Sequence, residues 1–250
     1  MAQPTNTLEW IAFLFQEYGE MFWQGTLVTL YIAIAGTLIG FVLGFALGVI
    51  GDLQVSPHDP WYRRLPVRVL KWIGDVYIEV FRDTPMIVQA MVLYYGLRSA
   101  GIEITPVPAA ILVTVLNTGA YMSETVRAGI NSIDPGQREG GLALGMTSMK
   151  IMVKVILPQA LRNIIPEMAN MFLTNLKMTS VLNVIGVTEL FMVAKTTGAV
   201  YYKYFEAYLC IALIYFVLCF LFNRLFLMLE KKMKGRADYA LAVEYMSDGE

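Results

Sequence analysis

Residues 134–166 read DPGQREGGLALGMTSMKIMVKVILPQALRNIIP, and the organisation of the whole chain depends on this stretch. It lies between two apolar segments, but it is neither a membrane span nor a plain polar loop. Small residues alternate with leucines here, so a helix would have a face that another protein can approach closely. Pro135 suits the first turn of such a helix, and Pro158 and Pro166 are expected to punctuate the chain after it. We predict a small amphipathic helix on the water side of a membrane, which either binds another protein or lies on the lipid headgroups.

The composition places the rest of the chain in a membrane. Hydrophobic residues make up 57% of the 250 residues and charged residues only 16%, below the usual quarter. A helix needs roughly 20 apolar residues to cross a bilayer. Four apolar segments have about this length or more. A fifth, residues 84–97, is long enough only if its helix begins near Ile73. The predicted spans are 25–50, 73–97, 104–123, 168–188 and 207–229. We therefore predict an all-α integral membrane protein with five transmembrane helices.

The positions of Lys and Arg predict the orientation of these helices, because cytoplasmic loops are enriched in both. Most of the 19 Lys and Arg residues fall in three segments, 63–71, 127–162 and 224–236. In a five-span chain these segments all lie on one side of the membrane. We therefore expect the N-terminus outside, the C-terminus inside and residues 134–166 in the cytoplasm.

The chain is expected to divide into three regions. Residues 1–24 mix large apolar side chains with glutamates, which predicts a helix lying on the outer membrane surface. Residues 25–229 form the transmembrane domain, and residues 230–250 an acidic cytoplasmic tail.

The first predicted span carries a ridge of glycines at every fourth residue: Gly36, Gly40, Gly44 and Gly48. A ridge without side chains lets the backbone of another helix approach closely. The neighbouring helix can belong to the same subunit or to a second copy, and both arrangements fit the sequence.

The residue inventory excludes most enzyme classes. The chain has no Gly-x-x-x-x-Gly-Lys-Ser/Thr phosphate loop, so it cannot bind ATP in the usual way. A single histidine, His58, leaves no Ser/His/Asp or Cys/His catalytic set. Neither His58 nor the two cysteines indicate a metal site or a disulfide framework. A transport protein with this inventory must use an ion gradient, passive flow or a partner that supplies energy.

Several motifs resemble one protein family. Glu139-Gly140-Gly141, then Gly145 and VILPQA at residues 155–160, are similar to the EAA motif. That motif belongs to the membrane-spanning permease subunits of ATP-binding-cassette (ABC) importers for polar amino acids of the histidine, glutamine and arginine type. The similarity covers most of residues 25–190.

Three further segments carry this resemblance: YIEVFRDTP at residues 77–85, AYMSETVRAGI at residues 120–130 and KMTS at residues 177–180. One position in the first and one in the last of these segments depart from the family's pattern. Asp83 stands where the family usually has a small residue, and Met178 stands where it usually has an aspartate.

The resemblance implies an ATP-driven amino acid importer in a bacterial cell membrane, with this chain as the permease subunit and not an enzyme. The implied partners are two ATPase subunits that bind ATP and Mg²⁺, a second permease copy or homologue, and an extracytoplasmic amino-acid-binding protein. The chain itself would bind no cofactor, and it would contact membrane lipids but no nucleic acid. The residues that would couple to the ATPase are Glu139, Gly140, Gly141, Leu144 and Gly145.

A stand-alone secondary transporter or channel for small polar solutes is the alternative function. Such a protein would be expected to show inverted repeats or a charged relay in mid-membrane, and the sequence shows neither.

The predicted substrate-binding residues are polar groups near the spans. Thr84-Pro85 breaks a helix and frees backbone carbonyls, an arrangement that many transporters use at a substrate site. Helical spacing puts Glu167, Asn170 and Thr174 close to one face, which predicts either a polar lining of the pathway or a polar seam between helices.

Glu124, near the end of the third predicted span, has two interpretations. An amino acid needs an acidic group for its ammonium, and Glu124 or Glu167 could provide it. Arg127 follows three residues later, so a local ion pair is equally compatible with the sequence.

Overall fold

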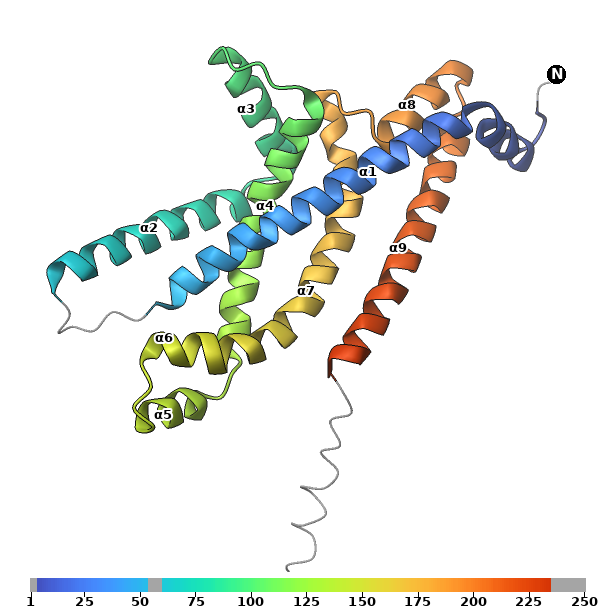
Figure 1. The fold of residues 1–250 in the computed structure, drawn as a ribbon. Helices are drawn as coiled ribbons and strands as arrows, with labels where there is room; N and C mark the ends of the chain where they lie inside the picture. Colours follow the sequence, from blue (N-terminus) through green and yellow to red (C-terminus); the bar gives the residue numbers. More distant parts are fainter. Residues whose placement is uncertain (1–3, 54–59, 235–250) are drawn as a thin grey trace, which may run out of the picture.

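The computed structural model describes residues 4–53 and 60–234, and all regular structure within them is helical. The elements are α1 (Thr7–Asp52), α2 (Trp61–Asp83), α3 (Met86–Ser99), α4 (Pro106–Asn131), α5 (Pro135–Ala143), α6 (Ser148–Ile151), η1 (Met152–Ile156), α7 (Leu157–Met178), η2 (Thr179–Ile185), α8 (Leu190–Tyr201) and α9 (Tyr204–Lys234). Figure 1 shows α5 and α6 at one end of the bundle, and α3 and α8 at the other. The predicted all-α class is confirmed over these residues. His58 and residues 235–250 of the predicted tail lie outside them.

Helix α1 joins two segments that the sequence predicts to be separate, the surface helix and the first span. Its backbone is helical throughout except at Tyr18, where φ is −114° and ψ is 15°. Before this kink Trp10 and Leu14 are buried, and the Trp10 ring centroid lies 5.5 Å from that of Tyr201 in α8. The N-terminal segment therefore packs on protein along one side, and the backbone irregularity lies at Tyr18 rather than near residue 24.

The glycine ridge of α1 packs against α4 of the same subunit. Each of its four glycines meets one side chain of α4, in the order Thr114, Thr118, Met122 and Val126. At Gly44 the two backbones approach most closely. A Cβ atom there would lie 2.7 Å from the carbonyl oxygen of Gly119. Of the two partners that the sequence allows, the structure shows the one within the subunit.

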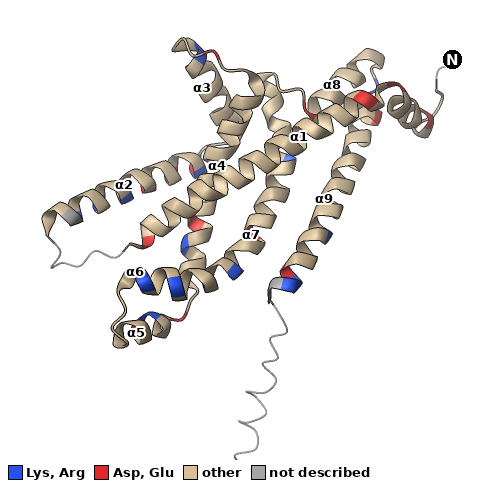
Figure 2. Ribbon diagram, viewed as in Figure 1, with Lys and Arg blue, Asp and Glu red and all other residues tan. Residues whose placement is uncertain are grey.

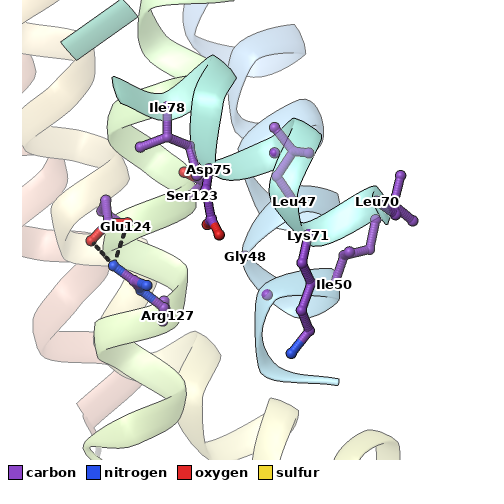
Figure 3. A pocket seen from close by; sticks show the side chains of 12 residues that line it. Leu47, Gly48, Ile50, Leu70, Lys71, Asp75, Ile78, Ser123, Glu124 and Arg127 are labelled. Atoms are coloured by element: carbon purple, nitrogen blue, oxygen red, sulfur yellow. Dashed lines mark hydrogen bonds and ion pairs between the residues drawn. The ribbon is translucent and has the colours of Figure 1, made fainter. Parts of the chain in front are cut away.

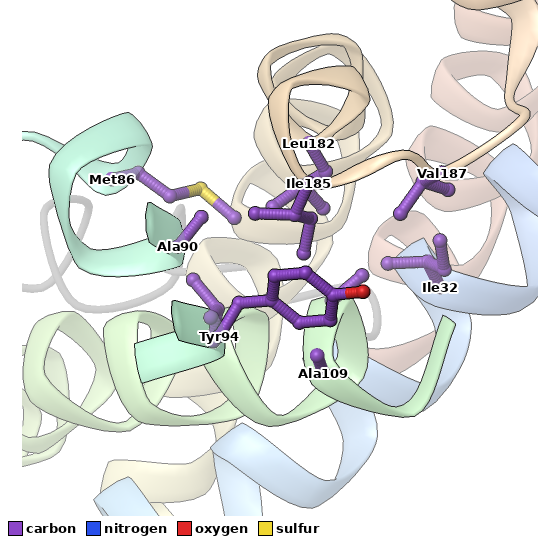
Figure 4. Close-up of a cluster of buried hydrophobic side chains, with 10 residues drawn as sticks. Ile32, Met86, Ala90, Tyr94, Ala109, Leu182, Ile185 and Val187 are labelled. Atoms are coloured by element: carbon purple, nitrogen blue, oxygen red, sulfur yellow. The ribbon is translucent and has the colours of Figure 1, made fainter. Parts of the chain in front are cut away.

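The helix breaks at Thr84-Pro85, as the X-Pro step predicts. Both residues have extended backbone, with ψ of 143° and 136°, so α2 ends and α3 begins there. Helix α3 then packs on α4 and η2 through an apolar cluster that contains Met86, Tyr94 and Leu182 (Figure 4). This packing fixes the position of the break beside α4.

A buried carboxylate begins α8. Glu189 is fully buried and accepts hydrogen bonds from the backbone nitrogens of Phe191 and Met192, at 2.8 and 2.9 Å. The hydroxyl of Tyr215 in α9 donates to the same carboxylate at 3.3 Å. These bonds satisfy amides that a helix N-terminus leaves unpaired, and they tie α8 to α9.

The stretch at residues 134–166 begins with the short helix α5. This helix starts at Pro135, as predicted, and the Asp134 side chain accepts a hydrogen bond from the backbone nitrogen of Gly136. The chain leaves α5 through Gly145, whose φ of +71° lies in the left-handed region that favours glycine. A sharp turn therefore separates α5 from α6.

From Ser148 the chain forms one continuous helical rod as far as Ile185. The rod comprises α6, the π-helical segment η1, α7 and the 3₁₀ segment η2. Pro158 lies in the first turn of α7, but Pro166 lies inside α7. The prediction that Pro166 punctuates the chain is therefore wrong, because α7 continues past it to Met178.

Helices α1 and α9 are each long and apolar enough to cross a membrane. The rod and α8, which meet at a bend of 57°, pass the same test as a pair. These elements overlap the first, fourth and fifth predicted spans, and α4 and the broken pair α2–α3 occupy the positions of the other two. Figure 2 shows Lys and Arg gathered at the end of the bundle that holds α5, α6 and the last turns of α9.

Candidate functional site

A cavity of about 610 Å³ lies beside the Thr84-Pro85 break. Its walls come from the end of α2, the start of α3, and from α4, α7 and η2. The lining residues are Arg82, Asp83, Thr84, Pro85, Met86, Ile87, Asn117, Tyr121, Met171, Thr174, Asn175, Met178 and Val181. This volume is typical of small-molecule sites, and the mixed walls suit a ligand with both polar and apolar surface.

Two side-chain amides stabilise the extended backbone at the break. Gln89 donates to the carbonyl oxygens of Phe81 and Thr84, each at 2.9 Å. Asn117 of α4 donates to the Gln89 side-chain oxygen at 3.1 Å. Because unpaired backbone groups are costly away from water, these bonds give the break one defined shape.

A third amide holds α7 against its neighbours next to the cavity. Asn175 is 2% exposed and donates to the hydroxyls of Thr37 in α1 and Thr118 in α4, at 2.8 and 2.9 Å. Three helices therefore meet at one side chain, one residue along α7 from Thr174. The cavity wall at Thr174 cannot move without disturbing this contact.

The substrate-binding residues predicted at the α2–α3 break and on α7 divide into two groups. Thr84 and Thr174 line the cavity. Glu167 and Asn170 are exposed on α7, as is Thr174, but they do not line the cavity. The predicted polar face of α7 therefore exists, and only its Thr174 end reaches the cavity.

Glu124 lies in a cluster of ion pairs outside the cavity. Its carboxylate accepts hydrogen bonds from Arg127 at 2.5 Å, and Nη1 of Arg82 lies 3.7 Å away. Figure 3 shows the Glu124–Arg127 pair beside a recess of about 20 Å³. Such a recess has room for about one water molecule and not for an amino acid. The ion pair with Arg127, one of the two predicted interpretations, is present in the structure.

Five polar residues of the cavity wall were not predicted as site residues from the sequence: Arg82, Asp83, Asn117, Tyr121 and Asn175. Two signals could have pointed to them. Arg82 and Asp83 directly precede the helix-breaking step, and Asn117 interrupts an otherwise apolar run of α4. The Arg82 guanidinium also lies over the Tyr121 ring, 5.7 Å from its centroid.

The predicted ATPase-coupling residues surround the turn between α5 and α6. Glu139, Gly140, Leu144 and Gly145 are exposed, with Leu144 at 83%. Gly141 differs from them, because a Cβ atom there would lie 2.7 Å from the Ile151 side chain of α6. The small residue at 141 therefore allows α5 to pack on α6 within this chain.

Helix α5 is also connected to the end of α1. Arg138 of α5 forms an ion pair of 2.8 Å with Asp52, and both side chains are largely shielded, at 25% and 14% exposure. This pair connects the exposed turn to the helix that carries the glycine ridge.

Comparisons with known proteins agree with this architecture. Residues 61–235 match the family described as "Binding-protein-dependent transport system inner membrane component". The chain is 36% identical to the arginine transport system permease protein ArtQ of Bacillus subtilis (strain 168), over 85% of this chain and 92% of that protein. It is 35% identical to the L-cystine transport system permease protein TcyB of the same organism, over 86% of this chain and 88% of that protein.

Two solved structures share the fold. One is an amino acid ABC transporter with histidines, at 33% identity and a TM-score of 0.79, covering 92% of this chain and all of that one. The other is the inward-facing MetNI methionine ABC transporter, at 20% identity and a TM-score of 0.70, covering 87% of this chain and 98% of that one. The chain therefore belongs to the binding-protein-dependent inner membrane components, as a multi-pass permease subunit, not an enzyme, of an ABC importer of the polar amino acid family.

Proposed function

We propose that the cavity beside the Thr84-Pro85 break binds the transported amino acid, and that the α5–α6 turn receives the ATPase subunit. The observation that carries this proposal is the helical rod from Ser148 to Ile185. One of its ends forms the turn with α5, and Thr174 and Met178 farther along it line the cavity. A displacement of the first end therefore changes the wall at the second.

The turn between α5 and α6 has the surface expected of a docking element. Three large apolar side chains are exposed there: Leu142 at 53%, Leu144 at 83% and Met149 at 61%. Arg138 and Lys150 lie on α5 and α6, the two helices that flank the turn, and Figure 2 shows Lys and Arg at this end of the bundle. A partner groove with an apolar floor and an acidic rim would complement this surface.

We propose the following assembly. Two permease copies, identical or homologous, form the pathway, two ATPase subunits bind the α5–α6 turns and carry ATP and Mg²⁺, and an extracytoplasmic protein delivers the amino acid. When ATP binds, the two ATPase subunits close on each other, and this motion pulls the two α5–α6 turns together and opens the cavity outward. ATP hydrolysis then returns the transporter to its starting conformation. The charge distribution supports five spans with the N-terminus outside and residues 134–166 inside.

Within this proposal Thr84 and Thr174 contact the substrate directly. Asn170 and Glu167 continue the exposed face of α7 and would line the path between the cavity and the ATPase end. For Glu124 the geometry favours an indirect role, because arginines occupy its carboxylate and one of them, Arg82, lines the cavity.

The test is ATP-dependent amino acid uptake by liposomes that contain the permease with its ATPase partner and binding protein. The variant Leu144→Glu places a charge on the turn, and we expect it to lose co-purification with the ATPase and uptake together. The matched control is Val200→Glu on α8, at the opposite end of the bundle, where Val200 is 56% exposed. Normal uptake by Leu144→Glu would contradict the docking role.

The orientation is tested by labelling single cysteines in a background without Cys210 and Cys219. A cysteine at Thr5 should react with an impermeant maleimide in intact cells, and one at Met149 only after permeabilisation. The reverse pattern would overturn the five-span topology.

A further inference from the structure

The cavity contains one positive and one negative group on adjacent residues, Arg82 and Asp83, and the other described lining residues are uncharged. Arg82 is anchored by Glu124 at 3.7 Å and by the ring of Tyr121. Within the described part of the chain, Asp83 has no hydrogen bond or ion pair. Its carboxylate is therefore available to a ligand.

Asp83 occupies a position at which a carboxylate is unfavourable unless a cation approaches. It is the last residue of α2, and the C-terminal end of a helix carries partial negative charge. The nearby carbonyls of Phe81 and Thr84 add to this negative potential, although Gln89 donates to both. A bound ammonium group would satisfy the carboxylate and the helix end together.

The rest of the wall suits an uncharged side chain. It includes Met86, Met171 and Met178, together with Val181. Methionine is flexible and polarisable, so such a surface adapts to apolar or thioether groups. No second charge in the described wall is available for a basic or acidic side chain.

We propose that Asp83 binds the α-ammonium group and Arg82 the α-carboxylate of the substrate, and that the transporter prefers amino acids with neutral side chains. The inference rests on the proposed function, in which this cavity is the substrate site. A zwitterion with a neutral side chain matches the balanced charge of the site, whereas an arginine or glutamate side chain would leave one charge without a partner in the wall.

The preference is tested by equilibrium binding of labelled amino acids to the permease–ATPase complex in nanodiscs, without the binding protein. The probes are L-methionine, L-glutamine, L-arginine and L-glutamate. We expect at least one neutral probe to bind about tenfold more tightly than either charged one. If no probe binds, the proposed function fails; if arginine or glutamate binds most tightly, the neutral preference is wrong.

The role of Asp83 is tested with Asp83→Asn and with the 2-hydroxy analogue of L-methionine, which lacks the ammonium group. Losing a charge-assisted contact typically weakens binding by roughly ten- to a hundredfold. We expect Asp83→Asn to lose this much affinity for L-methionine and to bind the analogue as tightly as the unsubstituted complex does. Glu79→Gln is the matched control, because Glu79 is exposed one turn earlier on α2 and does not line the cavity.

A second pair of ligands, L-methionine and L-methioninamide, tests Arg82 in the same way, because L-methioninamide lacks the carboxylate. Arg82→Gln should weaken the binding of L-methionine and leave the binding of L-methioninamide unchanged. If Asp83→Asn weakened the binding of L-methionine and of its 2-hydroxy analogue equally, the substitution would have changed the cavity as a whole, and the role of Asp83 would be overturned. Equal weakening of L-methionine and L-methioninamide by Arg82→Gln would overturn the role of Arg82 in the same way. If the unsubstituted complex binds L-methionine and Asp83→Asn binds it equally tightly, the assignment of Asp83 to the ammonium group is overturned. The proposal that this cavity is the substrate site would still stand.

Discussion

The contact between α1 and α4 predicts that a single methyl group at Gly44 destabilises the subunit. In Gly44→Ala the new Cβ would lie 2.6 Å from Cβ of Met122, 2.7 Å from the carbonyl oxygen of Gly119 and 2.9 Å from the backbone nitrogen of Ser123. Two of these atoms are backbone, so rotation of a side chain cannot remove the overlap, and the two helices must separate. Overpacking of this kind costs up to about 3 kcal/mol, and alanine returns about 1 kcal/mol of helix propensity.

The net loss is therefore up to about 2 kcal/mol, and this upper value corresponds to a fall in Tm of roughly 4–8 °C for a chain of this size. The assay is thermal unfolding in detergent, followed by tryptophan fluorescence. Gly74→Ala is the control, because it makes the same change within α2, where the one atom within 4 Å is Cδ2 of Leu47 at 3.7 Å. It should keep or raise the Tm. A Gly44→Ala protein that melts at or above the control would refute the reasoning.

Three further predictions concern the ends of the bundle. Arg138→Gln should uncouple ATP hydrolysis from transport, since it removes the ion pair with Asp52. The charge exchange, Arg138→Asp combined with Asp52→Arg, should restore the coupling. If the exchange does not restore it, Arg138 has a role other than this ion pair. Glu189→Ala should lower stability by about 0.5–2 kcal/mol through loss of the α8 cap, measured as Tm, with a smaller loss in Glu189→Gln. Gly145→Ala should cost about 1–2 kcal/mol of left-handed backbone strain and reduce co-purification with the ATPase, more so than Gly145→Asn.

Local features of the structure could be predicted from the sequence. The break at Thr84-Pro85, the start of α5 at Pro135 and the Glu124–Arg127 pair all depend on residues within one helical turn of each other. Their geometry follows from the spacing along the chain. The same reasoning correctly places Glu167, Asn170 and Thr174 on one exposed face.

Features that join distant parts of the chain could not be predicted in this way. The periodicity of the glycine ridge does not identify its partner, which is α4. Asn117 and Gln89 are 28 residues apart, and nothing in either segment reveals their hydrogen bond. The sequence assigns Gly141 to an external partner and does not reveal its contact with Ile151, because the return of α6 onto α5 depends on the turn at Gly145.

The π-helical segment η1 has a consequence for how this chain tolerates insertions and deletions. It lies in the rod between the α5–α6 turn and the cavity wall at Thr174. An α-helix advances about 100° per residue, so loss of one residue from α7 before Thr174 would rotate everything downstream by about that angle relative to the turn. Thr174 would then swing away from the cavity while the turn kept its place. A π-helical turn closes its hydrogen bonds one residue farther along the chain than an α-helical turn, so loss of one residue within η1 would convert it to α-helix and keep the two ends in phase. The number of residues between 157 and 174 is therefore as constrained as their identity, whereas η1 is the place in the rod that can lose one residue.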